Sequence, residues 1–298
     1  MPPSVHLVPP SDFDWTASDG PAATVREVVE AAASEDGGAP LDEAALLGLG
    51  HGLGASTLWL SDESGFAWRH DGALDLAVAP EARGQGAGAA LAAAATAEAG
   101  ALTAWSHGHH PGAAALAARF GFEPVRDLWV MRRPLDDLPP LPPAAHGADG
   151  VDVRTFRVGE DEDAVVAVNA EAFAHHPEQG SLTRAGLEER MAQPWFDPGG
   201  LFLAARSADG EIVGFHWTKV HDEEPPYGEV YVVGVSPRAQ GAGLGRRLTL
   251  TGLHHLAARG LAEVVLYVEA DNAPAVAVYG RLGFTHAPQD THVQYARS

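Results

Sequence analysis

Short hydrophobic runs separated by turn residues dominate the second half of the chain. Residues 201–207 (LFLAARS) and 212–220 (IVGFHWTKV) flank the sequence DGE at 209–211, which predicts a β-hairpin. Residues 229–235 (EVYVVGV) are β-branched and aromatic, and they predict the next strand. A sheet of at least three successive strands is therefore expected in this half.

Helical spacing replaces alternation after these strands. Leucines at helical intervals predict a helix over 244–260, and Gly260 suits its C-terminal cap. The apolar run 263–268 (EVVLYV) predicts a buried strand. Residues 273–283 predict a short helix in which Pro274 stands early, where a helix tolerates proline.

The first half repeats this order. Residues 58–68 predict a hairpin, 73–78 a strand and 86–100 an alanine-rich helix. We therefore predict a mixed α/β fold that occurs twice, each copy a central mixed β-sheet flanked by helices.

Two pairs of glycine signals support the repeat. Gly86 and Gly243 belong to glycine clusters (RGQGAGAAL and QGAGLGRRL), and Gly121 and Gly283 each precede a phenylalanine. The separations are 35 residues in the first copy (121 − 86) and 40 in the second (283 − 243), a modest loop insertion. Self-similarity on this scale indicates two copies of one fold.

A proline-rich stretch divides the copies. Four prolines lie within 139–143, so residues 139–150 can form neither a helix nor the interior of a strand. We expect an N-terminal domain over 1–138, this linker, and a C-terminal domain over 151–298. The length of 298 residues agrees with two domains.

Composition excludes several classes of function. A formal net charge of −21 argues against a nucleic-acid partner, because such binding needs clustered Lys and Arg. The chain has no cysteine, which excludes thiolate metal sites, a cysteine nucleophile and disulfides. No basic start followed by an apolar run opens the chain, and no apolar window reaches about 18 residues, so we expect neither a signal peptide nor a membrane partner. We expect a cytoplasmic monomer.

Each glycine cluster follows a predicted strand and opens a predicted helix. Small residues let backbone N–H groups turn toward a phosphate, and the helix N-terminus adds about half a positive charge. The second cluster has the pattern Gln240-x-x-Gly243-x-Gly245, without the Gly-Lys-Ser/Thr of nucleotide hydrolases. The alternative is that the glycines only make the start of the helix more flexible and bind nothing. Two such loops, each followed by a strand, a helix and Gly-Phe, favour phosphate binding.

These residues resemble a known motif. Gln240-x-x-Gly243-x-Gly245, followed by Asn272 and by Tyr279 ahead of the Gly-Phe pair, is similar to the acetyl-CoA motif of GCN5-related N-acetyltransferases. The resemblance implies that the second loop holds the CoA pyrophosphate and that the preceding strand splays from its neighbour. It implies acetyl-CoA as co-substrate and no metal. The implied acetyl-CoA residues of the second copy are Val233, Gly234, Val235, Gln240, Gly241, Ala242, Gly243, Leu244, Gly245, Arg246, Asn272, Ala273, Pro274, Ala275, Val276 and Ala277. Those of the first copy are Leu76, Ala77, Val78, Gly84, Gln85, Gly86, Ala87, Gly88 and Ala89.

A narrower resemblance covers the second half. The segments AFAHHPEQG, WFDPGGL, GFHWTKVH, GEVYVVGV and LYVEADN resemble the mycothiol synthases, two-domain acetyltransferases of actinobacteria. DEAALL and WVMRRPL are similar in the first half. The resemblance implies acetylation of the cysteinyl amine of cysteinyl-glucosaminyl-inositol, a small-molecule acceptor. The residues implied to line its site are Glu43, Glu178, Lys219, Glu229 and Tyr267; Lys219 is the only lysine of the chain.

Acetyl transfer to an amine needs a base for the ammonium proton, N–H donors for the oxyanion and an acid for the thiolate. Counting back from the glycine loops sets Glu229 opposite Gly72, and counting back from the Gly-Phe pairs sets Tyr279 opposite Ala117. We therefore predict Glu229 as base and Tyr279 as acid in a catalytic C-terminal domain. The N-terminal domain is a non-catalytic copy in this prediction.

Other interpretations remain open from the residues alone. The stretch HGHH at 107–110 invites a metal site, but it contains no acidic residue or cysteine, and we expect none. The acceptor could be another small amine or a peptide N-terminus. A CoA-binding sensor without turnover is the alternative of a different class.

Overall fold

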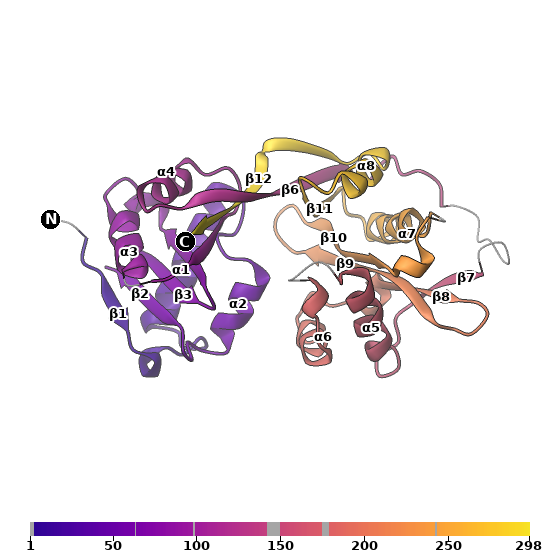
Figure 1. Ribbon diagram of the computed structural model, residues 1–298, viewed down its shortest axis with the longest axis horizontal. Helices are drawn as coiled ribbons and strands as arrows, with labels where there is room; N and C mark the ends of the chain where they lie inside the picture. Colours follow the sequence, from indigo (N-terminus) through magenta and orange to yellow (C-terminus); the bar gives the residue numbers. More distant parts are fainter. Residues whose placement is uncertain (1–2, 63, 98, 142–149, 175–178, 242) are drawn as a thin grey trace. The chain divides into compact units, whose positions relative to one another are not determined.

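A computed structural model describes residues 3–62, 64–97, 99–141, 150–174, 179–241 and 243–298. The chain forms two compact units, which we describe separately (Figure 1). Unit 1 comprises Met1–Trp129, Glu269–Asp271 and Ala287–Ser298, and unit 2 comprises Val130–Val268 and Asn272–His286. Strands β6 and β12 therefore contribute residues to both units.

Unit 1 is a mixed sheet with helices, and its strand order is β1-β2-β3-β4-β5-β12-β6. Its helices and strands are β1 (His6–Val8), η1 (Pro10–Asp12), α1 (Gly20–Asp36), α2 (Glu43–Gly50), β2 (Thr57–Ser61), β3 (Gly65–His70), β4 (Ala73–Val78), η2 (Pro80–Ala82), α3 (Ala87–Thr96), β5 (Leu102–Ser106), α4 (Pro111–Arg119), the first part of β6 (Glu123–Pro134) and most of β12 (Thr285–Arg297). The alanine-rich helix ends at Thr96, four residues earlier than the sequence predicted.

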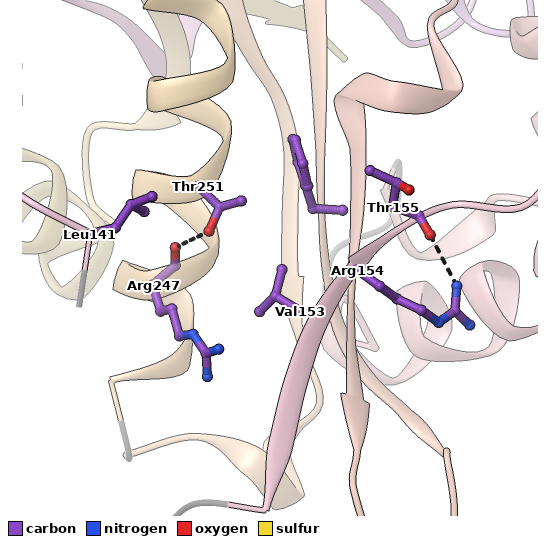
Figure 2. A pocket seen from close by; sticks show the side chains of 7 residues that line it. Leu141, Val153, Arg154, Thr155, Arg247 and Thr251 are labelled. Atoms are coloured by element: carbon purple, nitrogen blue, oxygen red, sulfur yellow. Dashed lines mark hydrogen bonds between the residues drawn. The ribbon is translucent and has the colours of Figure 1, made fainter. Parts of the chain in front are cut away.

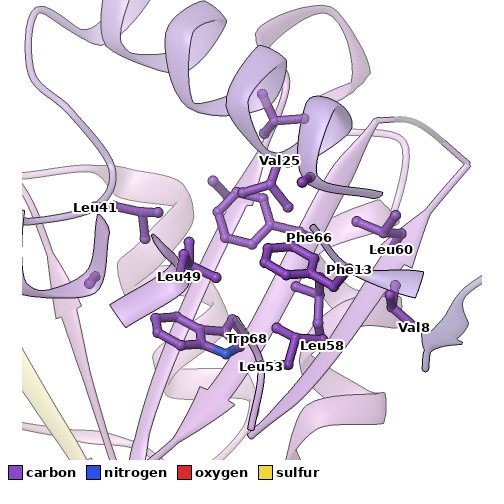
Figure 3. Packing of buried hydrophobic residues seen from close by; sticks show 14 of the residues in the cluster. Val8, Phe13, Val25, Leu41, Leu49, Leu53, Leu58, Leu60, Phe66 and Trp68 are labelled. Atoms are coloured by element: carbon purple, nitrogen blue, oxygen red, sulfur yellow. The ribbon is translucent and has the colours of Figure 1, made fainter. Parts of the chain in front are cut away.

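Alternating side chains of β3 pack on both faces of the unit 1 sheet. Phe66 and Trp68 belong to a cluster with Val25 of α1 and Leu49 of α2 (Figure 3). Ala67, between them in sequence, belongs to the opposite cluster, which α3 and α4 complete. Complete burial of a side chain such as Phe66 contributes about 1.5–3 kcal/mol, so the period of two in this strand decides where the helices dock.

Unit 2 repeats the arrangement, with the strand order β6-β11-β10-β9-β8-β7. Its helices and strands are the end of β6, β7 (Val151–Thr155), α5 (Glu162–Ala172), η3 (Gln179–Ser181), α6 (Arg184–Met191), η4 (Pro198–Gly200), β8 (Leu201–Arg206), β9 (Ile212–His221), β10 (Tyr227–Val235), η5 (Pro237–Ala239), α7 (Leu244–Ala258), β11 (Glu263–Glu269), α8 (Ala273–Arg281) and the start of β12.

Strand β9 separates the two cores of unit 2. Phe215 and Trp217 are fully buried against α5 and α6, where Val165 lies in the same cluster. His216 points to the other face, and its Nδ1 lies 2.8 Å from the carbonyl oxygen of Leu248 in α7. The mixed α/β fold predicted from the sequence is confirmed in both units.

The sheet registers align the two copies residue by residue. Val78 pairs with Gly65 in unit 1, and Val235 pairs with Gly214 in unit 2. Counting along β3 and β9 from these pairs matches Phe66 with Phe215 and Trp68 with Trp217. The same two aromatic residues therefore occupy the same two core positions in both copies.

The last strand, β12, does not follow the predicted division of the chain into two domains at the linker. Residues Val293–Arg297 of β12 pair antiparallel with Leu102–Ser106 of β5, so the C-terminus lies among the strands of unit 1 (Figure 1). The sequence analysis assigned all of 151–298 to the second domain. Alternation predicts that a strand forms but not which neighbour it pairs with, and this pairing joins residues about 190 apart.

No described helix is both long enough and apolar enough to span a bilayer. The predicted linker 139–150 lies mostly outside the described residues, which end at Leu141 and resume at Gly150.

Candidate active site

Two neighbouring parallel strands of unit 2 separate along their length. Among the described residues, β10 pairs with β11 only at Gly228–Val264 and Glu229–Val265, although β10 continues to Val235. The edge of β10 that faces β11 is therefore open over its last residues, and backbone groups there can bond to a ligand. Strands β4 and β5 of unit 1 also meet at one pair, Ala73–Thr103.

The glycine loop lies directly beyond the open end of β10. Gly241 and Gly243 have φ angles of 90° and 78°, a region that glycine adopts without strain. Gly243 is the N-cap of α7 and provides no side-chain cap, so the first N–H groups of α7 have no partner from that side chain. Gln240 donates from Nε2 to the carbonyl oxygen of Val235 at 3.2 Å and ties the loop to the strand.

A second helix N-terminus follows β11. Asn272 accepts a hydrogen bond from the backbone N–H of Ala275 at 3.2 Å, and Asn272, Ala273 and Pro274 are exposed. In unit 1 the residue at the matching position is His110, whose Nδ1 accepts from Gly112 N at 3.1 Å. Asn272 and His110 each lie 11 residues before the glycine of their Gly-Phe pair, and they share a capping role.

The loop of unit 1 has the same backbone shape. Gly84 and Gly86 have φ angles of 75° and 96°. Arg83 donates from Nε to Val78 O at 3.1 Å, as Gln240 does to the end of β10, and its guanidinium forms two 2.7 Å hydrogen bonds with Asp36. The sequence analysis missed Arg83, although it follows Val78 by five residues, as Gln240 follows Val235.

Glu229 is 7% exposed near the start of β10. Its Oε2 lies 2.7 Å from Nε2 of His221, and Lys219 is its cross-strand neighbour. The predicted counterpart Gly72 is wrong: β10 carries a β-bulge between Val230 and Val232, which adds one residue to the count. The register instead sets Glu229 opposite Ala73, since Glu229 pairs with Lys219, and Ala73 pairs with the matching residue of β3, His70.

Lys219 is held by aromatic rings. Its Nζ lies 4.7 Å from the ring centroid of Trp195 and 5.5 Å from that of Tyr231. Ammonium groups at these distances are attracted by the negative face of the ring. The lysine therefore occupies a defined position on the face of the sheet that also carries Glu229.

Three phenols of unit 2 have raised pKa values. Burial, together with the charges of Glu223 and Glu229, raises the pKa of Tyr227 to about 12. Desolvation and the nearby Glu229 raise the pKa of Tyr267, which is 42% exposed. Burial raises the pKa of Tyr279, in α8, to about 12. These hydroxyls therefore keep their protons at neutral pH and can act as donors.

The remaining predicted residues lie elsewhere. Glu43 is the first residue of α2 in unit 1, directly after the capping residue Asp42. Glu178 and Ala242 lie outside the described residues. Within unit 2 the structure brings Lys219 and Glu229 together, and Tyr267 follows Val265, the β11 partner of Glu229, by two residues, so its side chain lies on the same face.

The histidines at 107–110 have structural partners. His107 Nδ1 lies 3.3 Å from His292 Nδ1, and His110 caps α4. Over the part of the chain that the structure describes, no group of three or more His, Asp or Glu residues could hold a metal ion.

A pocket of about 600 Å³ lies apart from these residues, between β7 and α7 (Figure 2). Its arginines already have partners: Arg154 forms hydrogen bonds of 2.6 and 2.7 Å with Asp161, and Arg247 donates to Val151 O. Its other lining residues offer few polar groups, so it is not a second candidate for the reaction.

Comparison with known proteins identifies the family. Residues 168–284 match the acetyltransferase (GNAT) family, and residues 47–124 match an acetyltransferase (GNAT) domain. The mycothiol acetyltransferase of Nocardioides sp. (strain ATCC BAA-499 / JS614) is 54% identical over 92% of this chain and 97% of its own length. That of Catenulispora acidiphila is 49% identical over 93% of this chain and 96% of its own length. The chain belongs to the mycothiol acetyltransferase family.

Solved structures agree with the tandem fold. A GCN5-related N-acetyltransferase from Sphaerobacter thermophilus is 25% identical, covers 99% of this chain and 95% of its own, and has a TM-score of 0.66. A tandem GNAT protein from the clavulanic acid biosynthesis pathway has a TM-score of 0.61 at 23% identity, over 81% of this chain and 82% of its own. This member of the mycothiol acetyltransferase family is therefore an N-acetyltransferase with two GNAT domains, a fold family that uses acetyl-CoA.

The two GNAT domains differ at the two positions predicted to exchange protons. Unit 2 has Glu229 on strand β10 and Tyr279 on its last helix. Unit 1 has Ala73 and Ala117 at the matching positions; Phe122 N donates to Ala117 O as Phe284 N donates to Tyr279 O. Both copies keep the glycine loop, and only unit 2 has groups that can exchange protons at these two positions.

Proposed function

We propose that unit 2 transfers the acetyl group of acetyl-CoA to the cysteinyl amine of cysteinyl-glucosaminyl-inositol, which yields mycothiol. One observation carries the proposal: the strand that ends in the phosphate-binding type of loop also holds a buried carboxylate, Glu229, at the register position where unit 1 has Ala73. The names of the relatives supply the acceptor class.

The geometry of unit 2 fits acetyl-CoA. The opening between β10 and β11 offers backbone groups to the pantetheine amides, and the first turn of α7 offers N–H groups to the pyrophosphate. The residues assigned to these contacts are Val233–Val235, Gln240–Arg246 and Asn272–Ala277. Gly241 and Gly243 leave space beside the loop, since a Cβ at either would meet no atom within 4 Å.

The acetyl transfer requires a proton transfer before the attack on the thioester and another when the thiolate leaves. Glu229 accepts the proton of the acceptor ammonium, which frees the nitrogen lone pair to attack the thioester carbonyl. A backbone N–H within Val233–Val235 stabilises the oxyanion. The nitrogen loses its second proton to solvent as the amide forms, the C–S bond breaks, and Tyr279 donates its hydroxyl proton to the departing thiolate and regains one from solvent.

The acceptor needs a polar site. Lys219 and Tyr267 share with Glu229 one face of the unit 2 sheet, and they present an ammonium and a phenol to an acceptor rich in hydroxyls. Glu43 and Glu178 are assigned to the same acceptor by family resemblance. Unit 1, with Leu76–Val78 and Gly84–Ala89, keeps a loop of the same backbone shape, and we assign it a structural role or the holding of acetyl-CoA without turnover.

Thiol release from acetyl-CoA tests this function with a panel of amines. Cysteinyl-glucosamine is the positive probe, glucosamine tests the amino sugar alone, and a peptide with a free N-terminus tests the main rival. We expect a kcat/KM at least about 10²-fold higher for cysteinyl-glucosamine than for the peptide, because its sugar also offers hydroxyls to the site. Equal rates with the peptide would replace this function with general N-terminal acetylation, and release from no amine would favour a CoA-binding sensor.

A further inference from the structure

The hairpin β9–β10 is longer than its counterpart in unit 1. In unit 1, His70 pairs with Ala73, and a tight turn at 71–72 closes the hairpin. In unit 2 the matching pair, Lys219 and Glu229, is followed by two further pairs, the second of which joins His221 to Tyr227. The extension therefore exists in the copy that has the carboxylate, and it places an imidazole beside that carboxylate.

His221 is fixed on two sides. Its Nε2 lies 2.7 Å from Glu229 Oε2, and its ring stacks on Tyr227 with centroids 4.4 Å apart and an interplanar angle of 9°. The side chains of His221 and Glu229 are only 17% and 9% exposed. An ionised carboxylate only accepts hydrogen bonds, so Nε2 carries the hydrogen of this contact.

We propose that His221 is a positioning residue for the acetyl transfer. Its Nε2–H holds Oε2 of Glu229, which directs the other carboxylate oxygen toward the acceptor amine; among the described residues Oε1 has no hydrogen-bond partner. Loss of this donor would change only the contacts of the Glu229 carboxylate, so the pH profile of turnover is a readout for the contact. This inference rests on the proposed function, because it takes Glu229 as the base.

His221 neither gains nor loses a proton in this step. The ammonium proton of the acceptor passes to Oε1 of Glu229, while His221 keeps its Nε2 proton. Unit 1 supports the assignment by contrast: Ala73 replaces Glu229, and the hairpin ends before a counterpart of His221 could occur. Unit 1 does contain a histidine–carboxylate pair, His70 Nε2 and Asp75 Oδ2 at 2.7 Å, but Asp75 pairs with Trp68 and therefore lies at a different position in the register from Glu229.

Other titratable groups surround the pair. They come from β6, β9, the loop between β9 and β10, β10 and β11: Arg132, Lys219, Glu223, Tyr227, Glu263 and Tyr267. The test must therefore compare variants that leave these groups in place.

Two substitutions separate the hydrogen bond from the ring stack. His221→Phe keeps a flat ring against Tyr227 and removes the donor, whereas His221→Gln keeps an N–H donor near the position of Nε2 and removes the ring. The measurement is the pH profile of kcat/KM with acetyl-CoA and cysteinyl-glucosamine, alongside the thermal unfolding midpoint of each variant. We expect His221→Phe to lower kcat about 10-fold at pH 7 and to move the acidic limb up by about one pH unit.

His221→Gln should keep the acidic limb of the pH profile at its wild-type position and a kcat within about 3-fold of the wild type. Neither variant should change the KM for acetyl-CoA. The proposal is overturned if His221→Gln is as impaired as His221→Phe, or if His221→Phe keeps the wild-type limb. In a Glu229→Gln background, His221→Phe should cause no further loss; a second 10-fold loss there would show that His221 acts apart from Glu229. Full turnover by Glu229→Gln alone would instead refute the base assigned under the proposed function, so the two failures are distinct.

Discussion

Matched substitutions in the two glycine loops can show which copy serves turnover. Gly86 and Gly243 are the N-caps of α3 and α7, and both have positive φ angles, 96° and 78°. A Cβ at Gly243 would meet no atom within 4 Å, and one at Gly86 would lie 3.7 Å from Pro3. A side chain therefore causes little steric clash at either position, and the backbone strain is common to both.

Replacement of each glycine by glutamate adds strain and charge. The left-handed conformation costs a residue with a Cβ about 1–2 kcal/mol, so Gly86→Glu and Gly243→Glu should lose similar stability. At Gly243 the new carboxylate would also face the position assigned to the pyrophosphate. Two like charges about 4 Å apart repel by about 1–4 kcal/mol between bulk water and the protein surface. Together these effects predict a KM for acetyl-CoA raised at least about 10-fold in Gly243→Glu.

Steady-state kinetics and equilibrium binding give the readout. We expect Gly86→Glu to keep kcat and the KM for acetyl-CoA within about 2-fold, while any acetyl-CoA bound by unit 1 is lost from the binding stoichiometry. Urea unfolding checks that both variants fold and lose comparable stability. A Gly86→Glu protein that folds but does not turn over would refute the division of labour, as would a Gly243→Glu protein with an unchanged KM.

Three further substitutions test single groups. Glu229→Gln keeps an acceptor for His221 but cannot take a proton, and kcat should fall about 10²-fold or more, equivalent to about 2.7 kcal/mol. Tyr279→Phe keeps the edge contact with Phe284 and should lower kcat by a similar factor without changing stability by more than about 1 kcal/mol. Burial lowers the pKa of His216 to about 4, so below pH 6.5 the unfolded state binds a proton that the folded state excludes. The free energy of unfolding should therefore fall by about 2 kcal/mol more between pH 7 and pH 5 in the wild type than in His216→Asn.

Each of these tests has a clear contrary outcome. Wild-type turnover at neutral pH in Glu229→Gln or in Tyr279→Phe would remove that residue from the proton transfers. For His216, parallel curves of unfolding free energy against pH in the wild type and His216→Asn would show that another group titrates.

Local signals predicted most of the fold. Alternation and turn residues gave the hairpins, and the glycines at 84, 86, 241 and 243 occupy positive φ angles that favour glycine. The bulge at Val230–Val232 could not be predicted, because a bulge is visible only against a paired strand, and it displaced the alignment of Glu229 by one residue.

Non-local contacts account for what the sequence analysis missed at the candidate site. The neighbourhood of Lys219 depends on Trp195, which is 24 residues away, and on the bulged Tyr231. His221 follows Lys219 by two residues on the same strand, so alternation alone could have placed it on the face of Glu229. The distance of His221 from the Glu229 carboxylate could not be predicted without knowing which residues of β9 and β10 pair.

The pairing of β12 with β5 has a consequence for synthesis of the chain. Because Val293–Arg297 complete the sheet of unit 1, that unit lacks a strand until residues 293–297 have left the ribosome. Domains that lie wholly upstream can fold during translation, N-terminal first. Here the first-made copy must wait for the second, so a nascent chain stopped anywhere before residue 287 carries an unpaired edge at β5.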